Sequence, residues 1–287
     1  MVSTYYESQQ PMKRRLWKTW PKRLRSEFNE IGGLLAVMGF ALAVAPFTYD
    51  KPTEHPWLVA FIVLAAVGGV GASAIALWKS WPEAIRPIAE VYGKTIRLEE
   101  VSTLDPPPLR IGIVGPSYSG KSTLLQRIAA IPLTNERTIG VFAMVVQIPT
   151  LHSRAVALID GGGQYFTDQF RVAEVAEVLI VVIDHNQSET EKRLSEVRMD
   201  EHRQFAWQLR EKLKKGGQKK LIVLLANKAD IWRDIGIEET AKFRGYAAEQ
   251  HQTWANANLG NECVFAEHSN MSADNMTMLI RMLGKVG

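Results

Sequence analysis

Cysteine is nearly absent from this 287-residue chain, since Cys263 is the only one. No disulfide can form within the chain, which suits a reducing compartment. Histidine is also scarce, and the six residues do not show the spacing of a zinc site. The sequence contains no internal repeats. These absences exclude a disulfide-stabilised scaffold, a typical zinc protein and a repeat protein.

Charge is missing from two stretches, residues 31–49 and residues 56–78. Each stretch has about the length needed to cross a bilayer core, and only residues 50–55 separate them. We therefore expect two transmembrane helices that form an antiparallel hairpin. Five tryptophans near the ends of these runs suit the membrane interface: Trp17, Trp20, Trp57, Trp78 and Trp81. A buried hairpin in a soluble domain is the alternative, but it would normally show a polar face.

Basic residues lie on one side of the expected hairpin. Seven lysines and arginines precede the first run, further ones follow the second, and the turn between them carries only Lys51. The positive-inside rule then places both termini in the cytoplasm and makes the chain an integral membrane protein. The first thirty residues carry a net charge of +4, equal to that of the whole chain. We expect this basic arm to contact anionic lipid headgroups and not nucleic acid.

A phosphate loop is predicted at residues 115–122, Gly-Pro-Ser-Tyr-Ser-Gly-Lys-Ser. It follows an apolar run at residues 111–114 and precedes a helical segment, which is the order that phosphate binding requires. Backbone amides there can face the phosphates, Lys121 adds positive charge, and the Ser122 hydroxyl can hold Mg²⁺. The loop residues expected to bind nucleotide are Gly115, Ser119, Gly120, Lys121, Ser122 and Thr123.

A second motif, Asn227-Lys-Ala-Asp230, closes the apolar run at residues 221–225. It should lie at the carboxyl end of a parallel strand, where α/β sheets bind ligands. The Asp230 carboxylate can accept hydrogen bonds from N1–H and the 2-amino group of guanine, whereas adenine lacks that amino group. Asn227 would hold this base loop (residues 227–230) against the phosphate loop, and the stem of Lys228 would pack along the base. The bound nucleotide is therefore expected to be GTP or GDP.

A third motif, Asp160-Gly-Gly-Gly-Gln164, follows the apolar run at residues 156–159. Asp160 would hold Mg²⁺ through a water, Gly163 would offer its amide to the γ-phosphate, and Gln164 would orient the attacking water. With Lys121, Gly163 and Gln164 form the expected catalytic set. A glycine-rich turn without this role is the alternative.

Thr138 precedes another apolar run, residues 141–148, and is placed to be a second hydroxyl ligand of Mg²⁺. That contact exists only with a triphosphate, so residues 132–141 and 160–171 should change with the nucleotide state. The neighbouring Arg137 is either an ordinary loop residue or an arginine supplied in cis to the reaction. Ser117 would crowd the space near Gln164, which predicts slow hydrolysis without a partner.

Together these motifs resemble the Ras superfamily of small GTPases, and Thr-Ile-Gly-Val at residues 138–141 is closest to the Rab-like branch. The resemblance covers residues 105–287 and implies a P-loop GTPase fold. The fifth family motif, normally Ser-Ala, corresponds to Ser269-Asn270, with Ser272-Ala273 as a competing match. A strand at residues 178–183 and a helix at residues 191–214 are also placed as in that family.

The expected organisation has four parts: a basic arm at residues 1–30, a transmembrane hairpin at residues 31–78, a linker at residues 79–108 and a GTPase domain at residues 109–287. Its fold class is α/β, with a mostly parallel central sheet flanked by helices. A membrane-anchored switch that hydrolyses GTP and recruits a cytoplasmic effector or activating protein fits all of these features. A non-hydrolysing docking subunit, resembling the β-subunit of the signal-recognition-particle receptor, is the alternative. A pore formed by the hairpin is a third possibility.

Overall fold

The computed structural model describes residues 20–48, 56–81, 84–132, 140–148, 154–162, 165–188, 190–216, 220–257 and 259–284. The chain divides into two compact units, Met1–Arg86 and Pro87–Gly287.

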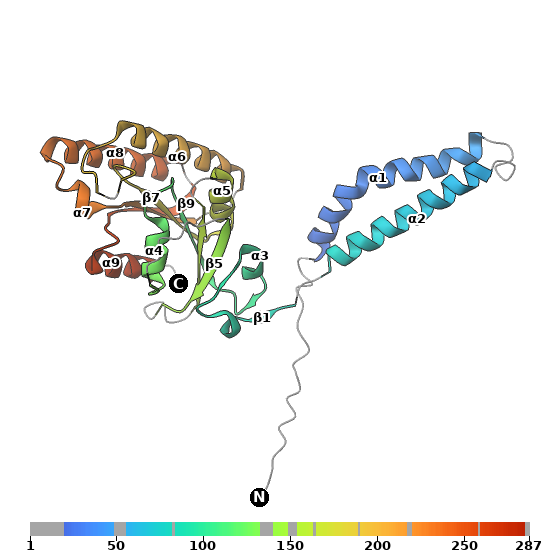
Figure 1. Ribbon diagram of the computed structural model, residues 1–287, viewed down its shortest axis with the longest axis horizontal. Coiled ribbons are helices and arrows are strands. Elements are labelled where there is room, and N and C mark those ends of the chain that lie inside the picture. The colour runs from blue at the N-terminus through green and yellow to red at the C-terminus, as the bar shows by residue number, and fades with distance from the viewer. Residues whose placement is uncertain are drawn as a thin grey trace, which may run out of the picture. The chain divides into compact units, whose positions relative to one another are not determined.

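The first unit consists of two long helices, α1 (Trp20–Thr48) and α2 (Pro56–Lys79), which lie side by side (Figure 1). Helix α1 begins inside the expected basic arm, ahead of residue 31. Pro21 lies in its first turn, where a fixed φ and a missing N–H are tolerated. The charged residues after it favour helix as well, so the helix extends beyond the uncharged run.

Two membrane spans were expected, and one is found among the described residues. Residues Val59–Lys79 of α2 form a helix that is long and apolar enough to cross a membrane, and 11% of its most apolar window is buried. The other expected span, residues 31–49, falls in α1, where many side chains lie outside the described residues. The two-span expectation is therefore corrected to one candidate apolar helix.

The second unit is an α/β domain. Its strands are β1 (Arg86–Pro87), β2 (Thr95–Arg97), β3 (Leu104–Asp105), β4 (Leu109–Val114), β5 (Val141–Val146), β6 (Val156–Gly161), β7 (Val178–Ile183), β8 (Lys220–Ala226) and β9 (Gly260–Glu267). Its helices are η3 (Ile88–Val91), α3 (Leu98–Val101), α4 (Lys121–Ile128), α5 (Phe166–Val175), α6 (Glu196–Gly216), α7 (Ala229–Trp232), α8 (Ile237–Asn256) and α9 (Ala273–Gly284).

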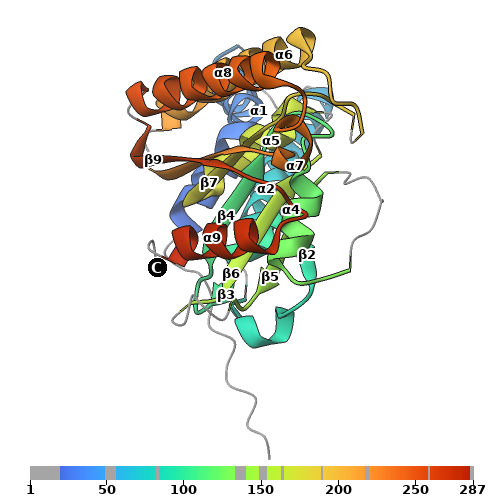
Figure 2. The same cartoon turned by 90° about the vertical axis from the view of Figure 1, so that its left-hand side faces the viewer.

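Seven of these strands form one mixed, mostly parallel sheet in the order β2-β5-β6-β4-β7-β8-β9. Strands β6, β4, β7, β8 and β9 run parallel to one another, while β5 is antiparallel to both β6 and β2. Helices cover both faces of the sheet (Figure 2). The expected α/β fold is confirmed at this level. Since β4, β6 and β8 are parallel, the loops that follow them meet at one edge of the sheet.

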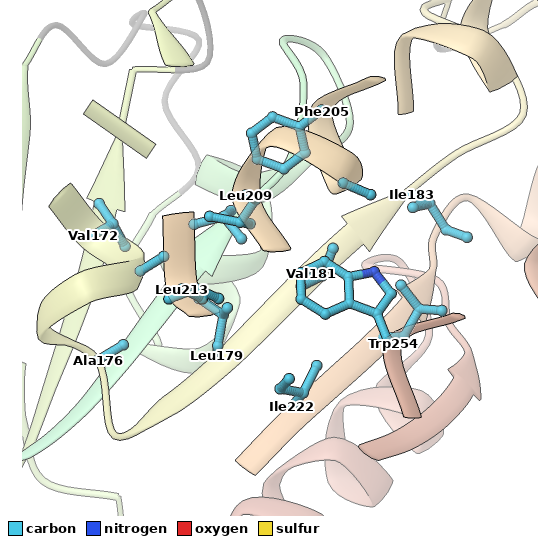
Figure 3. Close-up of a cluster of buried hydrophobic side chains, with 14 of the residues drawn as sticks. Val172, Ala176, Leu179, Val181, Ile183, Phe205, Leu209, Leu213, Ile222 and Trp254 are labelled. Carbon is cyan, nitrogen blue, oxygen red and sulfur yellow. The ribbon is translucent and has the colours of Figure 1, made fainter. Parts of the chain in front are cut away.

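Strand β7 shows why the central strands read as unbroken apolar runs. Leu179, Val181 and Ile183 face α5, α6 and α8 in one core (Figure 3). The alternate residues of the strand face α4 and α9 in a second core. A strand that is buried on both faces needs apolar side chains at every position.

The expected linker is largely part of the folded domain. Thr95–Arg97 pair antiparallel with Phe142–Met144, so β2 forms one edge of the main sheet. Strands β1 and β3 form a separate two-stranded sheet. Ile88, Val91 and Leu104 are buried against Val145. The second unit accordingly begins at Pro87 and not at residue 109, because this segment buries apolar side chains against the sheet.

Two helices begin at capping serines. Helix α6 begins at Glu196 and not at residue 191, because the Ser195 hydroxyl accepts a hydrogen bond from the Arg198 amide. Likewise, the Ser272 hydroxyl accepts the Asn275 amide at the start of α9. Ser272-Ala273, the competing match for the fifth motif, therefore forms the start of a helix.

Candidate nucleotide-binding site

The phosphate loop connects the central strand β4 to α4, so it emerges at the carboxyl edge of the sheet. Gly115 and Gly120 have φ values of +152° and +90°, which favour glycine. A Cβ at Gly120 would collide with the side-chain amides of Asn227 and Asn270. The glycine is therefore required by the close approach of two other loops, which the sequence motif alone does not reveal.

Lys121 lies inside the phosphate loop, and only 5% of its surface is exposed. Its Nζ donates a hydrogen bond to the Pro116 carbonyl over 2.8 Å. Burial lowers the pKa of this ammonium to about 8, although the nearby Asp160 carboxylate opposes that effect. A buried cation whose charge is poorly compensated is suited to receive an anionic ligand.

Ser122 and Asp160 are brought together from two elements. The Ser122 hydroxyl, in the first turn of α4, donates to Asp160 Oδ2 at 2.8 Å, and Asp160 lies near the end of β6. A hydroxyl and a carboxylate are hard oxygen donors of the kind that Mg²⁺ takes, often completed by phosphate oxygens. The donor set therefore fits the expected metal. The third expected ligand, Thr138, lies outside the described residues, as does Arg137.

The other expected catalytic residues, Gly163 and Gln164, also lie outside the described residues. The residue before them, Gly162, is described, and its amide donates a hydrogen bond to the Gly140 carbonyl at 3.0 Å. This hydrogen bond ties the end of β6 to the segment that leads into β5. Gly140 and Gly162, which belong to the two segments expected to change with nucleotide, thus adjoin each other at this edge.

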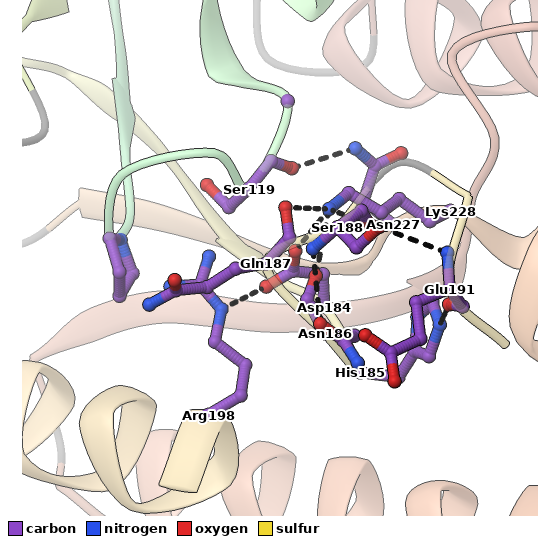
Figure 4. A network of polar contacts seen from close by, with 12 residues as sticks. Ser119, Asp184, His185, Asn186, Gln187, Ser188, Glu191, Arg198, Asn227 and Lys228 are labelled. Carbon is purple, nitrogen blue, oxygen red and sulfur yellow. Dashed lines mark hydrogen bonds and ion pairs between the residues drawn. The ribbon is translucent and has the colours of Figure 1, made fainter. Parts of the chain in front are cut away.

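The base loop contacts the phosphate loop as expected. Asn227 Nδ2 donates to the Ser119 carbonyl at 2.8 Å. Lys228 has a left-handed φ of +60°, and its Nζ lies 2.7 Å from Asp184 Oδ2 and donates to the Asn186 carbonyl (Figure 4). Asp230 is exposed in the first turn of α7, where its carboxylate is accessible to a ligand.

The last loop reaches the same place. Asn270 Nδ2 donates to the Gly120 carbonyl at 2.9 Å, and His268 Nε2 lies 3.1 Å from Asn270 Oδ1. The backbone amide of Ser269 is held by Asn275 Oδ1 at 3.0 Å. Ser269-Asn270 therefore adjoins the phosphate loop, and its assignment as the fifth motif stays a prediction. The asparagine in place of alanine supplies a contact to the phosphate loop.

The structure thus assembles most of the expected residues at one edge of the sheet. These are Gly115, Ser119, Gly120, Lys121, Ser122, Asp160, Asn227, Lys228, Ser269 and Asn270. Thr123 follows them in α4 and is half-buried. Among the described residues, no three histidine, cysteine or acidic side chains gather in a metal cluster. A metal here would depend on the serine hydroxyl and the nucleotide for further ligands.

Gln169 is a site residue that sequence reasoning missed. It lies on α5 and is fully buried; its Oε1 accepts the Gly115 amide at 3.0 Å, and its Nε2 donates to the Gly161 carbonyl. It thus bridges the start of the phosphate loop and the end of β6. A single glutamine within an amphipathic helix gives no signal of such a role.

Comparisons with known proteins add little. No protein-family model and no curated protein matches the sequence. Among solved structures, the chain is similar to the crystal structure of the bacterial selenocysteine-specific elongation factor EF-Sec, at 18% sequence identity and a TM-score of 0.43. The similarity covers 61% of this chain and 28% of that one, so it concerns a minor part of that factor. It assigns no family, and membership of the Rab-like branch stays a prediction.

Proposed function

We propose that this chain is a membrane-anchored GTP-binding protein that hydrolyses GTP slowly to GDP and recruits a cytoplasmic partner according to its nucleotide. The observation that carries the proposal is the convergence of two loops, one with Asn227 and one with Asn270, on the phosphate loop. Asn227 and Asn270 hold the carbonyls of Ser119 and Gly120, while Lys121 remains buried within the loop. This arrangement concentrates backbone donors and one cation at a single edge of the sheet, which suits a phosphorylated ligand.

Guanine selectivity is assigned to Asp230. Its carboxylate offers two acceptors and no donor at neutral pH, which matches N1–H and the 2-amino group of guanine. Asn227 and Lys228 fix the loop that carries it, since their side chains bond to the phosphate loop and to the segment after β7. Adenine would leave the carboxylate without a donor.

Hydrolysis is assigned to Gln164, Gly163 and Lys121. Gln164 would orient the attacking water, Gly163 would donate its amide to the γ-phosphate, and Lys121 would stabilise the charge that develops on the phosphate oxygens. Ser122, Thr138 and Asp160 would hold Mg²⁺, which supplies further positive charge at the phosphates. Because Thr138 and Gly163 would contact only a triphosphate, the segments around them would differ between the GTP and GDP states.

Phosphate release distinguishes hydrolysis from the alternative of a docking subunit that keeps its GTP. In single-turnover assays, we expect the unaltered chain to release phosphate at below about 10⁻² s⁻¹. Gln164→Ala should slow this at least about 10-fold, because the water loses its orienting group. Gln204→Ala, at an exposed position of α6, serves as the control. Release no faster than the buffer blank, with GTP still bound, would instead favour the docking subunit.

Membrane anchoring rests on the apolar surface of α2. Leu64, Val67 and Val70 are 76%, 67% and 72% exposed, and residues Val59–Lys79 carry no charge before Lys79. Apolar side chains in such number are suited to lipid. The basic arm at residues 1–30 would add attraction to anionic headgroups.

Alkaline carbonate extraction of membranes tests the anchor. We expect the unaltered chain to stay with the membrane, and a triple variant with lysine at positions 64, 67 and 70 to be released. Each lysine near the bilayer centre opposes insertion by about 2.5–3.5 kcal/mol. A variant with three lysines on the surface of α8, at Ala241, Ala248 and Ala255, should behave like the unaltered chain. Complete extraction of the unaltered chain would contradict anchoring.

A further inference from the structure

A buried arginine outside the expected motifs contacts the phosphate loop. Arg198 lies in the first turn of α6, and 1% of its surface is exposed. Its guanidinium divides three donors among three partners, and Figure 4 shows the bond to Asp184. Nε donates to Asp184 Oδ1 at 2.7 Å, one terminal nitrogen to Glu201 at 2.6 Å, and the other to the Ser117 carbonyl at 2.7 Å.

Asp184, directly after β7, connects this arginine to the base loop. Its Oδ1 accepts from Arg198 and lies 2.7 Å from His202 Nε2, while its Oδ2 lies 2.7 Å from the Lys228 ammonium. Burial opposes the charge of this fully enclosed carboxyl, yet His202, Arg198 and Lys228 hold its pKa well below the usual range. Asp184 therefore stays ionised and binds both cations.

The bond to Ser117 has a directional consequence. In a planar trans peptide, the carbonyl of one residue and the N–H of the next point in opposite directions. Holding the Ser117 carbonyl therefore aims the Tyr118 amide away from Arg198. In the same way, Asn227 and Asn270 aim the amides of Gly120 and Lys121 by holding the preceding carbonyls. Three side chains from three parts of the chain thus orient three backbone donors of the loop, the amides of Tyr118, Gly120 and Lys121.

We propose that Asp184 and Arg198 are positioning residues that couple the base loop to the phosphate loop. This inference rests on the proposed function. Lys228 reaches Asp184 from the base loop, and Arg198 carries the connection on to Ser117, so a displacement of either loop disturbs the other. A buried ion pair contributes little to stability compared with apolar packing. The Asp184–Arg198 ion pair instead fixes the relative placement of the two loops. The planar guanidinium makes three directed hydrogen bonds, which a lysine cannot replace.

The expected effect is faster loss of nucleotide. Arg198→Lys keeps a positive charge near Asp184 but cannot also reach Ser117 and Glu201, and we expect GDP to dissociate about 10-fold faster. Arg198→Met should accelerate GDP dissociation about 10- to 100-fold, the range for loss of a charge-assisted hydrogen bond. Arg203→Met is the matched control, because Arg203 lies on the same helix with exposed partners, and its rate should stay within about twofold.

A double-variant cycle separates coupling from general loosening. Dissociation of labelled GDP is measured for Arg198→Lys, Lys228→Met and the double variant. If Asp184 couples the two loops, the increase in the GDP dissociation rate of the double variant is smaller than the product of the two single increases by about threefold or more. Independent, multiplicative effects would overturn the inference.

The outcomes also separate this inference from the proposed function. An unaltered chain that binds no GDP would contradict the function itself. If the unaltered chain binds GDP, and Arg198→Lys and Arg198→Met both release GDP at the rate of the unaltered chain, only the positioning role is overturned. Thermal unfolding of each variant shows whether it is folded. If Arg198→Met is unfolded, the GDP dissociation rate of Arg198→Lys and the double-variant cycle test the positioning role.

Discussion

Asp230→Asn is expected to move the nucleotide preference of this protein from guanine to xanthine, with a change in the GDP-to-XDP affinity ratio of at least about 100-fold. The asparagine amide would donate where the carboxylate accepts. Xanthine has a carbonyl at C2 in place of the amino group of guanine, so it would complement the altered side chain. A base that leaves a polar group of the site unpaired is rejected strongly. Competition between GDP and XDP for a fluorescent nucleotide measures the ratio.

Asp234→Asn provides a matched control, since Asp234 is an exposed acid four positions further along the same segment. It should retain the guanine preference. If Asp230→Asn also retained that preference at full affinity, Asp230 would not contact the base. The phosphate-binding part of the proposal would stand, because it rests on other residues.

Lys121→Ala is expected to lower GTP affinity at least about 100-fold, because a buried ammonium beside the phosphates is lost. The unaltered protein should also show a dependence on pH that this variant lacks. The pKa of Lys121 is about 8 in the free site. Below pH 8 the lysine is protonated before and after binding, so affinity is flat. Above pH 8 binding must take up a proton, and affinity should fall by up to about tenfold per pH unit.

Titration calorimetry between pH 7 and pH 9 in two buffers of different ionisation enthalpy measures both the affinity and the proton uptake. Lys212→Ala, which removes an exposed lysine of α6, should leave both unchanged. An affinity for GTP that stays constant to pH 9 would show that Lys121 is not the charge that meets the phosphates.

Much of the domain could be predicted because its signals are local. Strands β4, β6, β7 and β8 are apolar at nearly every position, and β4, β6 and β8 are each followed by one of the predicted motifs. Because parallel strands end at the same edge of a sheet, their pairing is enough to bring Asp160, Asn227 and the phosphate loop together. The apolar helix α2 was predictable for the same reason.

What could not be predicted depends on contacts between distant parts of the chain. Arg198 occupies a polar position in an amphipathic helix, where an exposed side chain is the ordinary expectation, and only the fold places Asp184 and Ser117 beside it. Thr95–Arg97 are too few to show a strand pattern, so the sequence predicts a linker there. The start of α6 was misplaced because capping by Ser195 decides it more than amphipathic periodicity does.

The pairing of β2 with β5 limits how another protein can engage this sheet. Recognition by strand addition requires an edge whose backbone donors and acceptors are accessible. Because β2 already hydrogen-bonds to Phe142–Met144, an incoming strand can pair with β5 only if it displaces Thr95–Arg97. Under the proposed function, a partner that reads the bound nucleotide near β5 would use side chains, and Phe142 and Tyr165 offer exposed aromatic rings for that contact.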